Sequence, residues 1–471
     1  MAIWQAGVEA VTPERLFRDK VSLEGTVLSI EELQLDLAHF ERLIVVGAGK
    51  ASAAMAVALQ QTLLSQLPQS LKNLPVGGWV NVPEDTFTQR QADELQPLHL
   101  HAARPAGLNW PTAAAVAGTQ QILDWVRRAG PRDLVICLLS GGGSALLVAP
   151  RAGITLADKQ AVAREIAAAG GNIEQLNLVR RTLSDVKGGG LARACHAQCL
   201  LTLVLSDVLG DPLEVIASGP TLCDVAPQPQ QALAALQLLG LQHKPSLASV
   251  VQFLEQQIQA ESEQSSFPGR MMNASKSSNT NRCQVEHVIL GNNADAIDAA
   301  GVKAVELGYR YVMQGARRVE GDVTQVARSA VSAINQLTSQ KNIDCWISGG
   351  EPTVVLPAQG AGKGGRNQQL ALAVLQQLQA SGWSQAAQQP HRPVVFVSGG
   401  TDGEDGPTDA AGASIDLELS QRAFQLGMDA GDYLKRADAY SFFDRVGGLL
   451  RTGPTGTNVC DLRVALVGRD S

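Results

Sequence analysis

Three loops of similar composition contain residue types that bind phosphate or carboxylate groups. Each follows a short apolar run and reads Ser-Gly-Gly, at 140–142, 348–350 and 398–400. Glycine lets the backbone come close to a ligand, and N–H groups at the start of a following helix attract anions. Turns from strand to helix also need glycine for structural reasons alone. Three loops with the same lead-in favour a phosphorylated or carboxylated ligand.

Two cationic residues stand where helices are expected to begin. Lys50 follows Gly47-Ala-Gly49, and Arg366 follows Gly364-Gly365. The charge of Lys50 adds to the positive end of a helix dipole in attracting phosphate. Arg366 is suited to grip a carboxylate or phosphate with two parallel hydrogen bonds. The structural alternatives are a solvated lysine and a surface ion pair.

The loop at 47–52 is only a partial dinucleotide-binding fingerprint. Ser52 takes the place of the third glycine, and no clear acidic strand end follows about 20 residues later. It is not a Walker A loop either, because Ile44 and Ala51 replace the first glycine and the hydroxyl of that pattern. The loop therefore predicts phosphate binding more strongly than nicotinamide binding.

Acidic side chains cluster in two loops. Asp207 and Asp211 follow an apolar run, and Asp402 and Asp405 lie in the glycine-rich stretch 401–409. Carboxylate oxygens of this kind suit Mg²⁺, above all when a substrate phosphate shares the ion. Asp207 is also a candidate general base. The alternative is that these side chains cap turns and helices.

The elements that must position these loops alternate between strand and helix. Strands are expected within 43–46, 134–139, 200–205, 288–290, 345–347 and 394–397, and helices over 51–64, 155–169, 172–184 and from Ala294. Continuously apolar strands between helices indicate largely parallel sheets covered on both faces. We expect an α/β protein with two three-layer α/β/α domains, the N-terminal one Rossmann-like, and an active-site cleft between them.

The composition divides the chain and limits its class. Residues 255–282 are rich in Gln, Ser and Asn, so we expect a variable linker over 241–284 between domains at 1–240 and 285–471. The net charge of −7 argues against nucleic-acid and anionic-membrane partners. Seven irregularly spaced cysteines, no signal sequence and no long apolar stretch predict a cytoplasmic protein with free thiols.

Eight segments together resemble the class II glycerate kinases, the family whose C-terminal half is called the MOFRL domain. They run in order over nearly the whole chain, and the wording around 180–184 is similar to the animal branch. The segments are VVGAGKASAAM (45–55), LLSGGGSALL (138–147), VKGGGLA (186–192), LSDVLGDPLEVIASGPT (205–221), ISGGEPTVVL (347–356), GGRNQQLAL (364–372), SGGTDGEDGPTDAAGA (398–413) and TGPTGTNVCDL (452–462).

The resemblance implies ATP- and Mg²⁺-dependent phosphorylation of D-glycerate, giving 2-phosphoglycerate. It places the catalytic lysine on Lys50 and the active-site arginine on Arg366, and Asp207 joins them as metal ligand or base. The metal candidates are Asp207, Asp211, Asp402 and Asp405. The expected nucleotide-binding positions are Gly47, Gly49, Ser140, Gly141, Gly142, Gly143, Ser144, Gly349, Gly350, Glu351, Gly399, Gly400, Thr401 and Asp402.

Two departures from the family pattern affect the substrate contacts. Many bacterial members carry His-Pro-x-Pro-Asp where this chain reads Arg104-Pro-Ala-Gly-Leu108, and many carry a histidine where this chain has Arg181-Thr-Leu183.

Two other functions stay open: an NAD(P)-dependent hydroxypyruvate reductase and a non-catalytic sugar-acid or nucleotide-binding protein. A kinase of this kind should close by hinge motion through 240–290 to exclude water. The sequence leaves open the phosphorylated carbon, the nucleotide preference, the pathway that supplies glycerate and assembly into a homo-oligomer.

Overall fold

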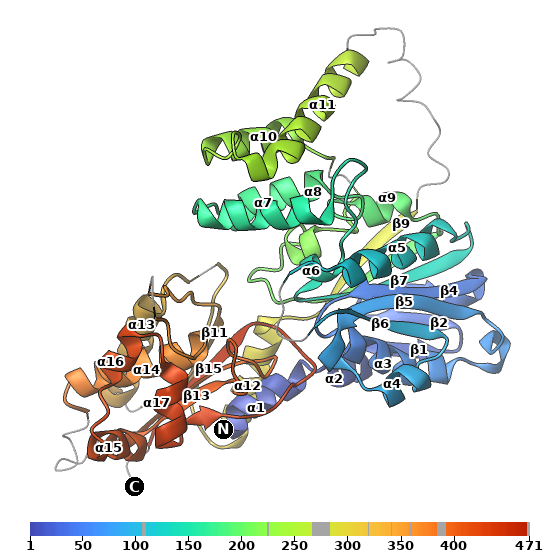
Figure 1. Ribbon diagram of the computed structural model, residues 1–471. Helices are drawn as coiled ribbons and strands as arrows, with labels where there is room; N and C mark the ends of the chain where they lie inside the picture. Colours follow the sequence, from blue (N-terminus) through green and yellow to red (C-terminus); the bar gives the residue numbers. More distant parts are fainter. Residues whose placement is uncertain are drawn as a thin grey trace. The chain divides into compact units, whose positions relative to one another are not determined.

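The chain folds into two compact α/β units, each built on a six-stranded sheet (Figure 1). The computed structural model describes residues 1–105, 110–223, 226–265, 283–318, 320–340, 342–357, 360–383 and 392–468. The N-terminal unit comprises 17–204 and 212–290, and the C-terminal unit comprises 1–16, 205–211 and 291–471. Among the described residues, no helix has the length and apolar character needed to cross a membrane.

The sheet of the N-terminal unit has the strand order β6-β5-β4-β7-β8-β9. The pairs β6–β5, β5–β4 and β4–β7 are parallel. Hydrogen bonds from Gln284 N to Gln198 O and from Ser206 N to Gly291 O show that β8 and β9 also run in the same direction. The strands are β4 (Arg42–Ala48), β5 (Val76–Pro83), β6 (Leu98–Arg104), β7 (Asp133–Ser140), β8 (Cys199–Leu205) and β9 (Gln284–Gly291).

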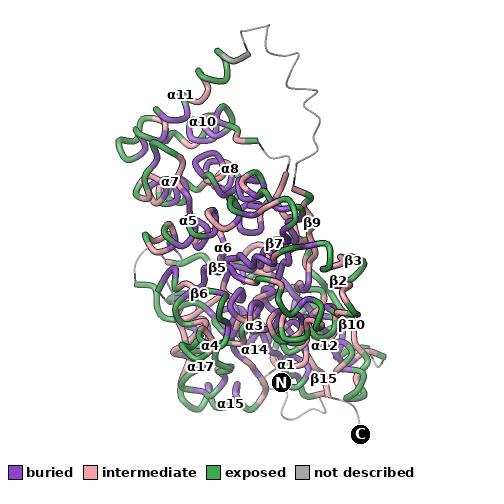
Figure 2. Tube along the Cα trace, turned by 90° about the vertical axis from the view of Figure 1, so that its right-hand side faces the viewer, coloured by how far each residue is buried: buried purple, intermediate pink, exposed green. Residues whose placement is uncertain are grey.

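Helices cover both faces of this sheet, as its apolar strands require. Every residue of β7 is buried, and Figure 2 shows the central strands in the buried colour. In Figure 1, α5 (Ala113–Arg127) lies on one face and α3 (Ser52–Thr62) on the other. This parallel, doubly covered sheet confirms the predicted α/β fold.

The remaining elements of the N-terminal unit include a small antiparallel sheet and a stack of helices. The order β1-β2-β3 defines the small sheet. Its strands are β1 (Val21–Glu24), β2 (Val27–Ile30) and β3 (Leu33–Asp36), and the helices are α4 (Gln89–Glu94), α6 (Gly143–Leu146), α7 (Leu156–Ala168), α8 (Ile173–Thr182), α9 (Gly190–Ala194), α10 (Pro229–Leu238) and α11 (Ala248–Ser265). The division between the two units, after Leu16, falls within α2 (Pro13–Lys20).

Part of the expected linker at 241–284 is helical. Val250, Phe253 and Leu254 of α11 are buried in a cluster with α7, α8 and α10, and their spacing forms one apolar stripe of the helix. Composition alone predicted a linker here, because the glutamines on the other faces of α11 make the segment polar on average. The rest of the polar stretch, 266–282, lies outside the described residues.

The sheet of the C-terminal unit has the order β10-β11-β15-β12-β13-β14 and is mostly antiparallel. Only the β10–β11 pair is parallel, which corrects the expectation of a largely parallel second sheet. The cause is β15, the last strand that the structure describes, which lies between β11 and β12 and runs antiparallel to both. The strands are β10 (Tyr311–Gly315), β11 (Cys345–Gly350), β12 (Val394–Gly400), β13 (Gly412–Ile415), β14 (Leu449–Leu450) and β15 (Asp461–Val467).

Two separate hydrophobic clusters form the two faces of this sheet. Leu462 and Val464 of β15 pack with the cluster that contains α1 residues, whereas Ala465 and Val467 pack with the opposite cluster. This alternation follows from the two-residue period of a strand. The helices of the unit are α1 (Ala2–Ala10), α12 (Asn293–Glu306), α13 (Val323–Ser339), α14 (Arg366–Ala380), α15 (Leu417–Gln425), α16 (Ala430–Lys435) and α17 (Ala439–Val446).

The first helix of the chain is anchored by a tryptophan in this C-terminal unit. Trp4 is 1% exposed, donates a hydrogen bond from Nε1 to Leu462 O at 3.0 Å, and fills the space left by Gly399. We expect Trp4→Ala to lower the free energy of unfolding by about 3–5 kcal/mol, because it leaves a large cavity. Urea unfolding would measure this, with Trp4→Phe as a control that should cost clearly less. Equal losses for both variants would contradict the packing argument.

Candidate active site

Lys50 lies in a tight turn between β4 and α3 of the N-terminal unit. A Cβ atom at Gly49 would stand 2.0 Å from Ser140 Oγ, so only glycine allows this approach of the two loops. The Lys50 N–H donates to Gly141 O at 2.8 Å, and the Ala51 N–H donates to Ser140 Oγ at 3.0 Å. These bonds tie the 47–52 turn to the 140–144 loop and place half-buried Lys50 at the head of α3.

The residues of the 140–144 loop have different neighbours. Ser140 is buried, and its hydroxyl is engaged with the 47–52 turn. Gly142 has φ +75°, a left-handed conformation that favours glycine. The atoms nearest to a Cβ placed there are Lys50 Cγ at 3.4 Å and Arg104 Nη2 at 3.5 Å. The Ser144 hydroxyl hydrogen-bonds to Ser218 Oγ at 2.9 Å.

The glycines of the other two Ser-Gly-Gly segments lie inside strands, where other side chains fill the space beside them. A Cβ at Gly349 would stand 1.7 Å from Asn293 Oδ1, and one at Gly350 would stand 1.9 Å from Glu320 Oε2. Gly399 makes room for Trp4, and Gly400 lies close to Glu404 O. Packing therefore accounts for these glycines, and their expected contact with a nucleotide stays a prediction.

Arg366, the first residue of α14, is held by two carboxylates of the C-terminal unit. Its Nε and Nη2 donate to Asp461 Oδ2 and Oδ1 at 2.8 and 3.0 Å, and its Nη1 donates to Glu351 Oε1 at 2.6 Å. Asp461 is completely buried, whereas the Arg366 side chain is 35% exposed. Three of the roughly five N–H donors of a guanidinium are thus used, and the group is fixed in one orientation.

Charge and burial act together in this cluster. Burial disfavours the charged guanidinium, but Asp461 and Glu351 outweigh it and raise the pKa of Arg366. Burial raises the pKa of Glu351 against the attraction of Arg366, and Asp461 and Asp402 raise it further. The structure therefore brings Glu351, Asp402 and Arg366 into one electrostatic neighbourhood.

Asp405, expected as a metal ligand, instead caps α14. Its Oδ1 and Oδ2 accept hydrogen bonds from the backbone N–H groups of Asn367 and Gln368 at 2.9 and 2.8 Å. The helix has no cap from its own N-cap residue, Gly365, and a Cβ there would stand 2.3 Å from Asp405. Asp405 fixes the start of the helix and so positions Arg366 one residue away.

This buried cap predicts a pH effect on stability. Burial raises the pKa of Asp405 to about 7, although the N–H groups of Asn367 and Gln368 oppose the shift. Because the folded pKa lies above the unfolded value of 3.8, the contribution to stability is complete below pH 3.8 and is lost as pH rises through about 7. We expect wild type to lose stability relative to Asp405→Asn over this interval, measured by urea unfolding at each pH. A difference that stays constant with pH would contradict this.

The other three acidic candidates are partly exposed, and each accepts a hydrogen bond. Asn458 Nδ2 donates to Asp207 Oδ2 at 3.1 Å, and Asn292 Nδ2 donates to Asp211 Oδ2 at 2.7 Å. Asp402 Oδ1 accepts from the Glu404 N–H at 3.1 Å. Within the part of the chain that the structure describes, no three His, Cys, Asp or Glu side chains are grouped as a metal site would require.

Sequence reasoning assigned no role to two residues in the segment 452–462. Asp461 is the main partner of Arg366, and Cys460 Sγ hydrogen-bonds to Asp207 O at 2.8 Å. Burial raises the pKa of the Cys460 thiol, and the neighbouring Glu351 and Asp207 carboxylates raise it further. The family motif at 452–462 marks this segment as important. It does not show that Asp461 pairs with Arg366, because the two residues are far apart in the sequence.

The structure locates both departures from the family pattern in the N-terminal unit. Arg104 is buried at the end of β6, near Gly142, whereas 106–108 lie outside the described residues. Thr182, at the end of α8, is buried and donates to Leu178 O at 2.9 Å.

Comparison with known proteins gives the family. The description "Domain of unknown function (DUF4147)" matches residues 1–255, and the MOFRL family matches 344–461. A glycerate kinase of Rattus norvegicus is 34% identical, covering 98% of this chain and 91% of its own. The crystal structure of a glycerate kinase from Thermotoga maritima has a TM-score of 0.74 at 30% identity, covering 99% of this chain and 97% of its own.

One further relative carries a different name. A protein of Agrobacterium vitis called "Putative hydroxypyruvate reductase" is 34% identical, covering 91% of this chain and all of its own.

The fold and these matches define an α/β phosphotransferase that acts on an alcohol group. The chain belongs to the glycerate kinase family whose C-terminal part is the MOFRL domain, and its animal relatives agree with the resemblance seen in the sequence.

Proposed function

We propose that this enzyme transfers the γ-phosphoryl group of ATP to the 2-hydroxyl of D-glycerate, giving 2-phosphoglycerate and ADP. The observation that carries the proposal is the placement of Lys50, fixed by the Gly141 carbonyl at the head of α3 and beside Gly142. These contacts hold the backbone of Lys50 at a helix N-terminus, where an ammonium group is suited to a phosphate. Phosphoryl transfer requires mainly positioning and neutralisation of charge.

The residues take separate roles in this reaction. Lys50 neutralises phosphate charge, and Arg366, held by Asp461 and Glu351, offers its remaining N–H groups to an anionic oxygen. Asp207 accepts the proton of the attacking hydroxyl or serves the metal. The new bond joins the glycerate oxygen to phosphorus, the β–γ bridging bond breaks, and ADP leaves with the electron pair.

Mg²⁺ fits this chain as an ion that enters with the nucleotide. The described residues form no three-ligand protein site, but Mg²⁺ in kinases is commonly held by one or two carboxylates together with substrate phosphates. Asp207, Asp211 and Asp402 are partly exposed and suited to this role, whereas both Asp405 oxygens already cap α14. The ion would neutralise phosphate charge.

The deciding experiment measures ADP release by the purified chain with ATP, Mg²⁺ and D-glycerate, followed by an enolase-coupled assay for 2-phosphoglycerate. We expect both signals, and we expect the loss of both when EDTA removes Mg²⁺. ADP release without the enolase signal would indicate phosphorylation of another hydroxyl. Absence of ADP release with D-glycerate and related hydroxy acids would refute the kinase.

Hydroxypyruvate reduction is the second candidate. It is favoured by the name of the Agrobacterium relative and by Glu84, an exposed acid directly after β5 that could contact a ribose. Against it stand Ser52 in place of the third glycine and Lys50 inside the turn. Oxidation of NADH or NADPH on addition of hydroxypyruvate without ATP would support it.

A further inference from the structure

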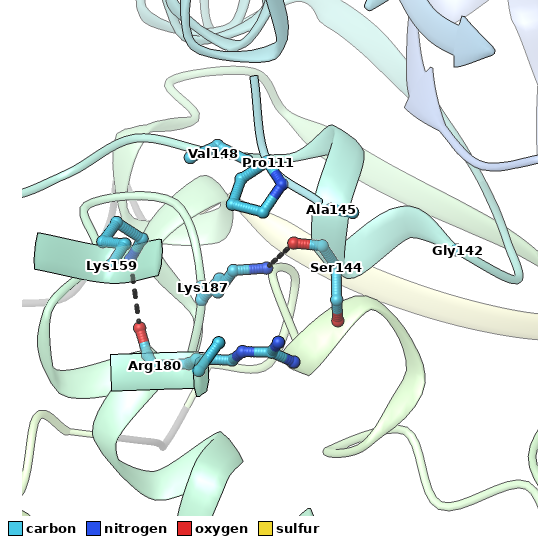
Figure 3. Close-up of a pocket in the computed structure, with 9 residues that line it drawn as sticks. Pro111, Gly142, Ser144, Ala145, Val148, Lys159, Arg180 and Lys187 are labelled. Carbon is cyan, nitrogen blue, oxygen red and sulfur yellow. Dashed lines mark hydrogen bonds between the residues drawn. The ribbon is translucent and has the colours of Figure 1, made fainter. Parts of the chain in front are cut away.

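A cavity of about 230 Å³ in the N-terminal unit contains three cationic side chains (Figure 3). Its lining includes Gly142 and Ser144 of the 140–144 loop, together with Lys159 of α7, Arg180 of α8 and Lys187. Figure 3 shows Lys187 and Arg180 directed toward Ser144. None of the lining residues is acidic, so the lining gives these three basic side chains no carboxylate partner.

The two lysines are fixed by carbonyl groups, whereas the Arg180 guanidinium has no such support. Lys187 Nζ donates to Ser144 O at 2.8 Å, and Lys159 Nζ donates to Leu183 O at 3.2 Å. Among the described residues, the Arg180 guanidinium has no hydrogen bond or ion pair. A guanidinium in a cavity without a carboxylate partner is a ready site for an anion.

The mutual repulsion and the burial of these three basic side chains also favour an anionic ligand. Burial and the charge of Arg180 lower the pKa of Lys159 to about 7, although Asp185 opposes the shift. Burial, Lys159 and Arg180 lower the pKa of Lys187. Asp185, the acid that acts on Lys159, pairs with Arg151 at 3.5 Å and is not part of the lining. An anion would relieve both the repulsion and the lost hydration.

The volume of the cavity matches a small molecule. At about 30 Å³ per water-sized group, 230 Å³ holds about seven or eight such groups, close to the non-hydrogen atoms of a three-carbon hydroxy acid. Sites for drug-sized ligands are commonly about 300–1,000 Å³, so the volume of this cavity matches a smaller ligand better than a nucleoside triphosphate.

We propose that this cavity binds the carboxylate of the acceptor, a small hydroxy acid, with Arg180 as its main partner and Lys159 and Lys187 in support. The proposal rests on the proposed function for the identity of the acid. Gly142 lines the cavity and also stands beside Lys50, so one loop links the bound acid to the proposed catalytic lysine.

The test measures D-glycerate binding to the full chain by isothermal titration calorimetry without nucleotide. Arg180→Gln should bind D-glycerate at least about tenfold more weakly than wild type, because a charge-assisted pair is lost. The matched control is Arg164→Gln, which removes the same charge from an exposed position on α7 and should stay within about twofold. Both variants should bind ATP like wild type.

Equal D-glycerate affinity of Arg180→Gln and Arg164→Gln would overturn the proposal. So would loss of ATP or inorganic phosphate affinity in Arg180→Gln with D-glycerate affinity unchanged, because the cavity would then take a phosphoryl group. If Arg180→Gln does not fold, a crystal of wild type soaked in D-glycerate decides: density in the cavity supports the proposal, and density only elsewhere refutes it.

These outcomes are separate from those of the kinase assay. Binding that depends on Arg180 in a chain that releases no ADP would support the cavity and refute the kinase. Full turnover with the same KM for D-glycerate in Arg180→Gln and Arg164→Gln would support the kinase and refute the cavity as the D-glycerate site.

Discussion

Lys50→Ala should lower kcat by about 10²–10³-fold or more with little change in the free energy of unfolding. Removing a group that neutralises charge in a transition state typically has effects of this size. The side chain is half-buried and is not part of a hydrophobic core cluster, so the fold should tolerate its loss. Steady-state kinetics with ATP, Mg²⁺ and D-glycerate, beside urea unfolding, would measure both quantities.

Two variants calibrate this result. Lys72→Ala removes a lysine from an exposed position of the same unit and should leave kcat unchanged. Lys50→Arg keeps the charge but moves it, so we expect an intermediate loss. A Lys50→Ala variant within a few-fold of wild type would remove this residue from the reaction.

Arg366→Ala should lower both turnover and stability. The variant leaves Asp461 buried without the partner that binds both of its oxygens, and breaking a buried pair costs about 3–5 kcal/mol. Because the Arg366 side chain is 35% exposed, water can reach the site, and we expect about 2–3 kcal/mol in urea unfolding.

Arg366→Lys separates charge from geometry. It keeps a cation near Asp461 but loses the planar fork that meets both carboxylates, so kcat should fall by about tenfold or more while stability falls less than in Arg366→Ala. Arg451→Ala is the control: its pairs with Asp409 and Asp444 lie at the surface, so its loss should lower stability much less than Arg366→Ala does. Equal kcat for Arg366→Lys and wild type would contradict the role of the fork.

The strands and the loops that follow them were predictable because their signals are local. Apolar runs at 43–46, 134–139 and 345–347 fall inside β4, β7 and β11, and the loop after β7 lies beside Lys50. The antiparallel second sheet was not predictable in this way. β15 pairs with strands that lie more than 60 residues earlier in the sequence. Local hydrophobic patterns carry no information about such distant pairing.

The candidate site was partly predictable for the same reason. Lys50 and Arg366 stand in recognisable motifs, whereas Arg180 and Lys187 come from a helix and a loop that only the folded chain brings to Ser144. Asp405 shows how one sequence feature fits two roles. An acid in a glycine-rich loop suggests a metal ligand, but burial and two backbone N–H groups make it a helix cap.

The place of α1 in the C-terminal unit has a consequence for how the chain is synthesised. Trp4 is synthesised 458 residues before Leu462, yet the two are joined in one hydrophobic cluster of the C-terminal unit. Domains generally fold as they emerge, so the parallel sheet of the N-terminal unit can assemble while α1 still waits for β15. Until then the apolar face of α1 is uncovered, and a nascent chain stalled before residue 461 should depend most on chaperones.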